Sequence, residues 1–424
     1  MLFNYIKIAF RNLFRQKLYA GINILGLSLG MSICILVLLF VRNEYQYDKW
    51  YENSDRIYRF TGSFKYDGEV EPTALSPRPL ARMLADELPE VEAATHVLTA
   101  WNEWLVKSEG IEFYTDQYAR VDSTFFDVFA MPFAHGNRTT IFDQPDQVVL
   151  SKDFAQRIFG EENPMGKVLN IRNRKDFIVA GVLEKSQGPS HFGFDLYLPL
   201  RQRTPRDNDW VSNFNYYTYA RLNQPIELLA LNDKVRRLYD ERKRPILQAE
   251  GEEADASFDV NVSAQRLTDI YLHSQLDNEI QASGDIRYVY VYTIIAIIIL
   301  LIACINFMNL STARSARRAR EVGVRKVVGA SRLMSSGQFL IEALIQSFLA
   351  LGLGFILVEL FLPIFSSILE KKIYLPAEQV PSVLVICFFM ALITGLLAGS
   401  YPAIFLSGFQ PIRVLKGDFS KSKE

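Results

Sequence analysis

Four long apolar stretches interrupt an otherwise mixed sequence. They cover residues 19–41, 288–310, 336–365 and 381–406, and the first two contain no charged residue. A helix needs about 20 consecutive, mostly apolar residues to cross the hydrocarbon core of a bilayer. We therefore expect four transmembrane helices. The first stretch is too long for the apolar core of a signal peptide, so we expect it to remain in the chain.

Positive charges gather in three segments beside these stretches. Residues 1–18 carry four Lys or Arg and no acid, residues 311–335 carry seven against one Glu, and the tail 407–424 is also net positive. Lys and Arg are enriched in the cytoplasmic loops of membrane proteins. The three segments are therefore expected in the cytoplasm, and residues 42–287 and the short loop 366–380 on the other side.

Residues 42–287 have the pattern of a folded α+β domain with two lobes. Apolar and polar residues alternate from Ile57 onward, as in a strand, and other segments repeat with helical spacing. Further strands are expected at 147–150, 177–183, 195–200 and 216–222, and helices at 79–88, 151–159 and 226–247, the second of these capped by Ser151 and Gly160. The expected fold is thus an α-helical membrane protein with four transmembrane helices and a large α+β extracytoplasmic domain between helices 1 and 2.

Sequence motifs for catalysis or metal binding are missing. The four histidines are scattered, and the three cysteines, Cys34, Cys304 and Cys387, have no metal-binding spacing. Residues 160–168 imitate a phosphate-binding loop, but five residues separate the glycines and Val168 replaces the required Ser or Thr. A net charge of -1 gives no indication of nucleic-acid binding. We expect no catalytic residue, no metal and no cofactor in this chain.

An aromatic tract in the outer domain allows two interpretations. Trp101 and Trp104, with Tyr114 and Tyr118, could line a pocket for an apolar ligand or belong to a core.

The N-terminal segment has the pattern of an amphipathic helix. Lys7, Arg11 and Arg15 recur at every fourth position, which aligns them on one helix face, and apolar residues recur on another face. Such a helix lies on a membrane surface with its cations near anionic headgroups. Membrane lipid is therefore an expected partner.

The segment between the second and third apolar stretches combines cations, one acid and glycines. Glu321 lies four residues from both Arg317 and Arg325, a spacing that allows pairing along a helix. We expect this segment to dock a cytosolic partner. Its candidate coupling residues are Arg317, Arg318, Arg320, Glu321, Gly323, Arg325, Lys326, Gly329 and Arg332.

Three residues inside the expected spans are candidates for specific roles. Glu342 is a functional candidate because carboxylates are rare within spans, although a position at the membrane interface is the alternative. Gly26 and Gly30 form a small-x-x-x-small pattern that favours close helix packing, and contact with a second unit is one hypothesis for it.

Several motifs together resemble one family of transport proteins. The run Arg-Glu-Val-Gly-Val-Arg-Lys-Val-Val-Gly-Ala-Ser at 320–331 resembles the signature of ABC transporter permeases of the FtsX, LolC/LolE and MacB type. Val-Asp-Ser-Thr-Phe-Phe-Asp-Val-Phe at 121–129 and Pro-Met-Gly-Lys at 164–167 resemble the MacB-like periplasmic core domain, and Gly-Ser-Tyr-Pro-Ala at 399–403 resembles the family's C-terminal end. The resemblance covers essentially the whole chain.

The resemblance implies a permease subunit in the bacterial inner membrane, with its large domain in the periplasm, that works by mechanotransmission. A separate cytosolic ABC ATPase would bind ATP and dock on residues 314–332, and a second permease unit would complete the membrane part. Their motion would drive efflux or extraction of a substrate, with a periplasmic adaptor as a further partner. The alternative is an FtsX-like signalling scaffold that activates a periplasmic cell-wall hydrolase.

The arrangement of the relatives leaves the second unit open. MacB carries a fused ATPase domain that this sequence does not contain, and relatives with a similar N-terminal segment hold two permease units in tandem. We therefore expect either a half-length permease that forms a homodimer or the first half of a tandem permease.

Overall fold

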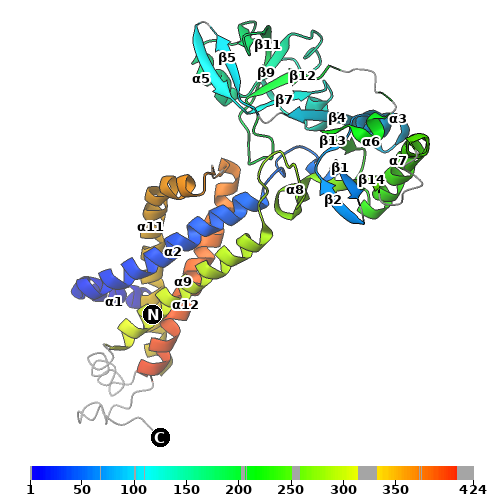
Figure 1. Ribbon diagram of the computed structural model, residues 1–424. Helices are drawn as coiled ribbons and strands as arrows, with labels where there is room; N and C mark the ends of the chain where they lie inside the picture. Colours follow the sequence, from blue (N-terminus) through cyan, green and yellow to red (C-terminus); the bar gives the residue numbers. More distant parts are fainter. Residues whose placement is uncertain are drawn as a thin grey trace, which may run out of the picture. The chain divides into compact units, whose positions relative to one another are not determined.

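The computed structural model describes residues 2–66, 68–99, 102–108, 110–201, 206, 208–250, 258–313, 332–371, 373 and 375–407 (Figure 1). The chain divides into two compact units. We call Met1–Asn43 together with Arg287–Glu424 the membrane unit, and Glu44–Ile286 the outer unit.

Long apolar helices make up the membrane unit. Four helices in the described ranges are long and apolar enough to cross a membrane, which confirms the four expected spans. They are α2 (Lys17–Tyr45), α9 (Ile286–Ala313), α11 (Arg332–Ile368) and α12 (Val380–Ser407), and α1 (Leu2–Arg15) and the 3-10 turn η3 (Ala377–Gln379) complete the unit. At 1.5 Å per residue, 28 residues reach about 42 Å, more than the ~30 Å hydrocarbon core. Each helix can therefore span the bilayer.

Small residues bring α11 and α12 close together. A methyl group added at Gly399 would lie 2.7 Å from Cβ of Ala343, and one added at Gly395 would lie 2.9 Å from Cδ2 of Leu344. Lipid tails are as apolar as leucine, so helices in a bilayer associate through close packing instead of hydrophobic burial. The glycines of α12 permit that packing.

One mixed sheet forms the outer unit. Its fourteen strands, counted over the described residues, follow the order β14-β1-β13-β4-β7-β12-β9-β11-β10-β5-β6, with β2 beside β1, β3 beside β13 and β8 beside β11. Neighbours on the main path are antiparallel except β7 with β12 and β9 with β11. The strands are β1 (Ile57–Tyr66), β2 (Glu69–Thr73), β3 (Ser76–Pro77), β4 (Val91–Thr99), β5 (Trp104–Ser108), β6 (Ile111–Thr115), β7 (Tyr118–Val121), β8 (Phe133–Gly136), β9 (Gln147–Leu150), β10 (Val168–Ile171), β11 (Lys175–Leu183), β12 (Leu196–Pro199), β13 (Phe214–Leu222) and β14 (Phe258–Arg266).

Helices lie at both ends of this continuous sheet (Figure 1). The division of the outer domain into two lobes stays a prediction. One end, with β14, β1, β13 and β4, carries α3, α6 and α7, and the other, with β9, β11, β10 and β5, carries α5. The helices are η1 (Ser54–Arg56), α3 (Leu80–Glu87), α4 (Phe125–Val128), α5 (Lys152–Phe159), α6 (Asp209–Ser212), α7 (Leu228–Glu250) and α8 (Leu267–His273).

Apolar cores fill the space between the sheet and these helices. Phe60, Leu84 and Val235 belong to the core under α3 and α7, and Phe154 and Leu196 to the core under α5. A third core, rich in aromatic side chains, lies at the centre of the unit and includes Phe125, Phe129 and Tyr219. Full burial of one such side chain contributes about 1.5–3 kcal/mol relative to an exposed one.

Local signals placed α5 correctly. The Ser151 hydroxyl accepts a hydrogen bond from the Phe154 N–H at 3.2 Å, and Gly160 ends the helix with φ of 60°. Most residues disfavour that region of φ, whereas glycine enters it readily. The cap residues expected from the sequence are therefore the ones that bound this helix.

Candidate functional site

The expected docking segment lies largely outside the described residues. This holds for Arg317, Arg318, Arg320, Glu321, Gly323, Arg325, Lys326 and Gly329, and Arg332 is the first residue of α11. Their role in ATPase coupling stays a prediction.

The N-terminal cations lie on a helix, as the pattern indicates. Lys7, Arg11 and Arg15 are all exposed on α1, while Ala9 is fully buried. Phe14 of the same helix is 70% exposed. The helix therefore has cations and an apolar ring available on its surface, and its place on the inner leaflet remains a prediction.

The glycine pair of α2 packs within the chain. A methyl group at Gly30 would lie 2.9 Å from Cβ of Ala303 on α9, and one at Gly26 would lie 3.5 Å from Nδ2 of Asn306. These glycines therefore lie against α9, and their contact with a second unit stays a hypothesis.

Glu342 lies inside the helix bundle of the membrane unit. It is 4% exposed and shares one face of α11 with Gln338 and Gln346, both also buried. A cavity of about 10 Å³, the size of one water, borders Glu342 together with Tyr19 of α2 and Ser311 of α9. A position at the membrane interface stays the alternative. The functional role of Glu342 remains a prediction.

The aromatic tract of the outer unit belongs mostly to a core. Trp104 is 5% exposed and stacks on Tyr118, with ring centroids 3.6 Å apart, while Tyr114 is 61% exposed. Trp101 lies outside the described residues. Trp104 and Tyr118 are therefore core residues, which is the second of the two interpretations.

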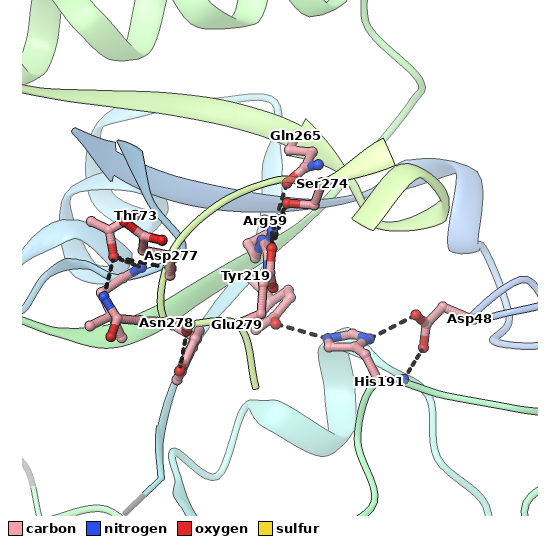
Figure 2. A network of polar contacts seen from close by, with 12 residues as sticks. Asp48, Arg59, Thr73, His191, Tyr219, Gln265, Ser274, Asp277, Asn278 and Glu279 are labelled. Atoms are coloured by element: carbon pink, nitrogen blue, oxygen red, sulfur yellow. Dashed lines mark hydrogen bonds and ion pairs between the residues drawn. The ribbon is translucent and has the colours of Figure 1, made fainter. Parts of the chain in front are cut away.

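A buried polar network holds the two segments that link the outer unit to the spans (Figure 2). We call residues 44–51, at the end of the first span, the incoming segment, and residues 267–286, which lead into the second span, the outgoing segment. The name connector clamp denotes the network that fixes both, made of Glu44, Asp48, Arg59, His191, Tyr219, Tyr271 and Glu279.

The incoming segment is fixed through Asp48. Its carboxylate accepts hydrogen bonds from Nδ1 of His191 at 2.8 Å, from the His191 backbone N–H at 3.1 Å and from the Ser190 hydroxyl at 2.9 Å. Asp48 is 0% exposed and has a left-handed backbone, with φ of 60°. A non-glycine residue holds that conformation only where surrounding contacts favour it. Asp48 is thus held by the loop between β11 and β12.

Tyr219 of β13 extends this network. Its hydroxyl lies 2.8 Å from Nε2 of His191. Burial raises the pKa of Tyr219 well above its ordinary value, so the hydroxyl keeps its proton. His191 thus bridges Asp48 and Tyr219, with one ring nitrogen bonded to each of them.

The outgoing segment is fixed through Arg59 of β1. One terminal nitrogen, Nη2, donates to Glu279 at 2.7 Å and to Ser274 at 3.1 Å, and the other also pairs with Glu279. The same Nη2 donates to Gln265 of β14 at 2.7 Å. Burial lowers the pKa of Arg59, but the hydrogen bonds of Arg59 to Glu279 and Tyr219, together with the negative charge of Glu279, outweigh burial and leave the pKa raised. The Arg59 side chain is 0% exposed, so this is a buried ion pair.

Sheet register explains why these residues meet. Arg59 lies directly opposite Gln265 on one side and Tyr219 on the other, in the β14-β1-β13 ladder. Directly opposed residues have Cβ atoms about 4.5–5.5 Å apart. Tyr219 therefore lies beside Arg59, which holds the outgoing segment, and beside His191, which holds the incoming segment. The outgoing segment is held further by the Tyr217 hydroxyl, which donates to the Asn278 carbonyl at 2.6 Å.

The two segments also contact each other. Tyr271 of α8 donates to Oε2 of Glu44 at 2.8 Å and stacks on Tyr47, with parallel rings 3.4 Å apart between centroids. Burial raises the pKa of Tyr271, and Tyr47 and Glu44 raise it further, so the hydroxyl stays a donor. Glu44 belongs to the last turn of α2 and Tyr271 to the outgoing segment. The clamp thus joins both connectors to one sheet.

Sequence reasoning missed this clamp. Asp48 and His191 are 143 residues apart in the chain, and Arg59 and Glu279 are 220 apart. None of the pairs has a local spacing motif. The signal that could have pointed to it is an Arg within an otherwise inward-facing strand, because Arg is seldom buried without a partner. Within the described part of the chain, no group of three or more His, Cys, Asp or Glu could hold a metal ion.

Comparison with known proteins gives two family matches in separate parts of the chain. Residues 20–238 match the MacB-like periplasmic core domain, and residues 293–411 match the FtsX-like permease C-terminal domain.

Individual relatives are distant. The macrolide export ATP-binding/permease protein MacB of Bdellovibrio bacteriovorus is 26% identical over 63% of this chain and 38% of its own length, so the chain spans well under half of that relative. The ABC transporter permease YvrN of Bacillus subtilis is 24% identical over 97% of this chain and 99% of its own. The crystal structure of the periplasmic region of MacB from Actinobacillus actinomycetemcomitans aligns at 16% identity and a TM-score of 0.31, over 47% of this chain and 87% of that chain.

Proposed function

The chain belongs to the MacB-like periplasmic core domain family and is an inner-membrane permease with an FtsX-like C-terminal domain, and from this we propose that it transmits motion from a cytosolic ATPase to its periplasmic domain. The ATPase is a separate protein that binds and hydrolyses ATP. A second permease unit completes the membrane part. The motion of the periplasmic domain drives efflux or extraction of a substrate.

The connector clamp is the observation that supports transmission of motion to the periplasmic domain. Transmission of force requires that the periplasmic domain follow its connectors without yielding at the joint. The incoming and outgoing segments are both bonded into the β14-β1-β13 ladder by buried, charge-assisted contacts. Hydrogen bonds to ionised groups contribute about 1.5–3 kcal/mol each, roughly twice the neutral value. Motion of either connector is therefore passed to the whole sheet.

The cationic segment 314–332 is the proposed docking site for the ATPase. The test is a pull-down from membranes with the intact chain and with a Glu321→Lys, Arg325→Glu double variant. We expect an ABC ATPase to co-purify with the intact chain and to be lost from the variant. Other proteins captured with the intact chain indicate what the permease does in the periplasm. A cell-wall hydrolase among them would favour the signalling alternative.

A matched variant controls for charge reversal as such. Lys152 and Glu184 form an exposed ion pair in the outer unit, with Nζ and Oε2 2.9 Å apart. A Lys152→Glu, Glu184→Lys double variant exchanges charges of the same kind away from the docking segment, and it is expected to retain the ATPase. If the intact chain captures no ATPase by itself, the pull-down is repeated with a second permease unit supplied. If no ATPase is captured in that case either, the proposed function is wrong.

A further inference from the structure

A groove of about 470 Å³ runs between α9 and α12 of the membrane unit. Its walls are residues 297–304 of α9 and 385–397 of α12, and nearly all of these side chains are apolar. The volume lies within the ~300–1,000 Å³ of typical small-molecule sites. Such sites are mostly apolar and contain a few polar groups that orient the ligand.

One polar group in this groove is Thr394 of α12. Thr394 is 1% exposed, and its hydroxyl has no hydrogen-bond partner among the residues that the structure describes. Within a bilayer no bulk water can serve such a group, and an unsatisfied buried hydroxyl is costly. The unpartnered hydroxyl therefore indicates that something other than the chain supplies an acceptor.

Other threonines in the spans show what a satisfied hydroxyl looks like. On α9, the Thr293 and Thr312 hydroxyls each donate at 2.7 Å to the carbonyl four residues earlier. This back-bonding is the usual solution for threonine in a helix. Thr394 lines the groove but does not form this bond to the carbonyl four residues earlier.

The chemistry of the groove selects its occupant. The groove covers thirteen residues of α12, about 18 Å along the helix axis, and Thr394 lies near the middle of that helix. A plain lipid tail fits the apolar walls but presents only hydrocarbon at this depth, so it leaves the hydroxyl unsatisfied. A ligand that satisfies both features is mostly hydrocarbon and has an oxygen acceptor within its hydrophobic body.

We propose that this groove binds a lipophilic small molecule from the membrane, whose carbonyl or ether oxygen accepts a hydrogen bond from Oγ1 of Thr394. The site is independent of the connector clamp and of ATPase docking. It adds a ligand site in the membrane to the mechanical function proposed above.

Photolabelling tests this assignment on the full chain in nanodiscs. The probes are two diazirine-bearing fatty-acid esters that differ only in a mid-chain keto group, and labelled peptides from α9 and α12 are quantified by mass spectrometry. One neutral hydrogen bond corresponds to about a fivefold difference in binding. We expect the keto probe to label the groove about fivefold more than the plain probe. Thr394→Val removes that difference and Thr394→Ser retains it.

A second threonine provides the control. Thr293→Val removes a hydroxyl that is already satisfied within α9, so the preference for the keto probe should persist. Thr394→Val is nearly isosteric and leaves no partner behind, so the variant is expected to fold. Equal labelling by both probes would mean that the groove holds only lipid tails, and no labelling by either would mean that another helix covers it. Both results overturn the proposal.

Discussion

Both ends of the periplasmic sheet have an apolar core, but they differ in where their charged side chains lie. At the end formed by β14, β1 and β13, which holds both connectors, charged side chains lie in the interior, and Arg59 and Asp48 are each 0% exposed. At the end formed by β9, β11, β10 and β5, the interior is apolar and the ion pairs lie on the surface, as for Lys152 with Glu184.

The difference shows which end of the sheet requires a specific arrangement of its buried side chains. Apolar packing is not directional, so a core such as that around Phe154 tolerates small shifts. A buried ion pair is favourable only with correct geometry, because each charge has lost its water. The connector end therefore has one preferred arrangement of the incoming and outgoing segments, as transmission of motion requires. The predictions below compare the two ends.

Arg59→Ala should have the largest effect. It removes the cation that faces Glu279, and breaking a buried pair typically costs about 3–5 kcal/mol because a charge remains uncompensated. Urea unfolding of the outer unit in the full chain, followed by tryptophan fluorescence, measures the change in free energy of unfolding. An Arg59→Met, Glu279→Leu double variant leaves no such charge and should lose less. A cost below about 1 kcal/mol for Arg59→Ala would contradict the buried pair.

Tyr219→Phe should have the next largest effect. It leaves Nε2 of His191 buried without its hydrogen-bond partner, which costs about 1–3 kcal/mol. The same unfolding measurement applies. The rings have nearly the same shape, so the loss reflects the hydrogen bond, and a variant as stable as the wild type would show that His191 does not depend on it.

Ser151→Ala tests the end without connectors. It removes the N-cap of α5, whose hydroxyl accepts from the Phe154 N–H, and should cost about 1 kcal/mol. Ser151→Asp restores an acceptor at the cap and should recover most of that loss. If Ser151→Ala were neutral, the cap would not contribute to the stability of α5.

Lys152→Ala should have the smallest effect. The pair with Glu184 is exposed, and exposed ion pairs contribute about 0–1 kcal/mol. Any effect should shrink as salt is added, because salt screens surface charges. Unfolding at low and high salt checks this, and a loss above about 2 kcal/mol would place this pair with the buried ones.

Patterns in the sequence predicted the elements but not the clamp. Hydropathy located the four spans, since a bilayer demands long apolar helices, and local cap signals bounded α5. The strand expected at 147–150 is β9, Gln147–Leu150. These features depend on neighbours within a few residues of each other.

Contacts between distant residues had no such signal. The meeting of Asp48 with His191 depends on the path of the loop between β11 and β12, and that of Arg59 with Tyr219 on strand register. The glycine pattern on α2 favours close packing, but only the fold shows that α9 is the neighbour of Gly30. The spacing of the motif does not encode which helix it meets.

The most direct test of the account measures ATP-driven motion between the two units. Spin labels at Phe14→Cys on α1 and Leu229→Cys on α7, both on exposed side chains, are placed in a chain whose three native cysteines are replaced by alanine. Their distance distribution is recorded in the complex with its ATPase, with and without trapped ATP. We expect ATP to shift the distribution in this background and with Ser151→Ala, and the shift to be reduced with Tyr219→Phe while ATP hydrolysis continues. A distribution that ATP leaves unchanged in the intact complex would contradict the mechanism.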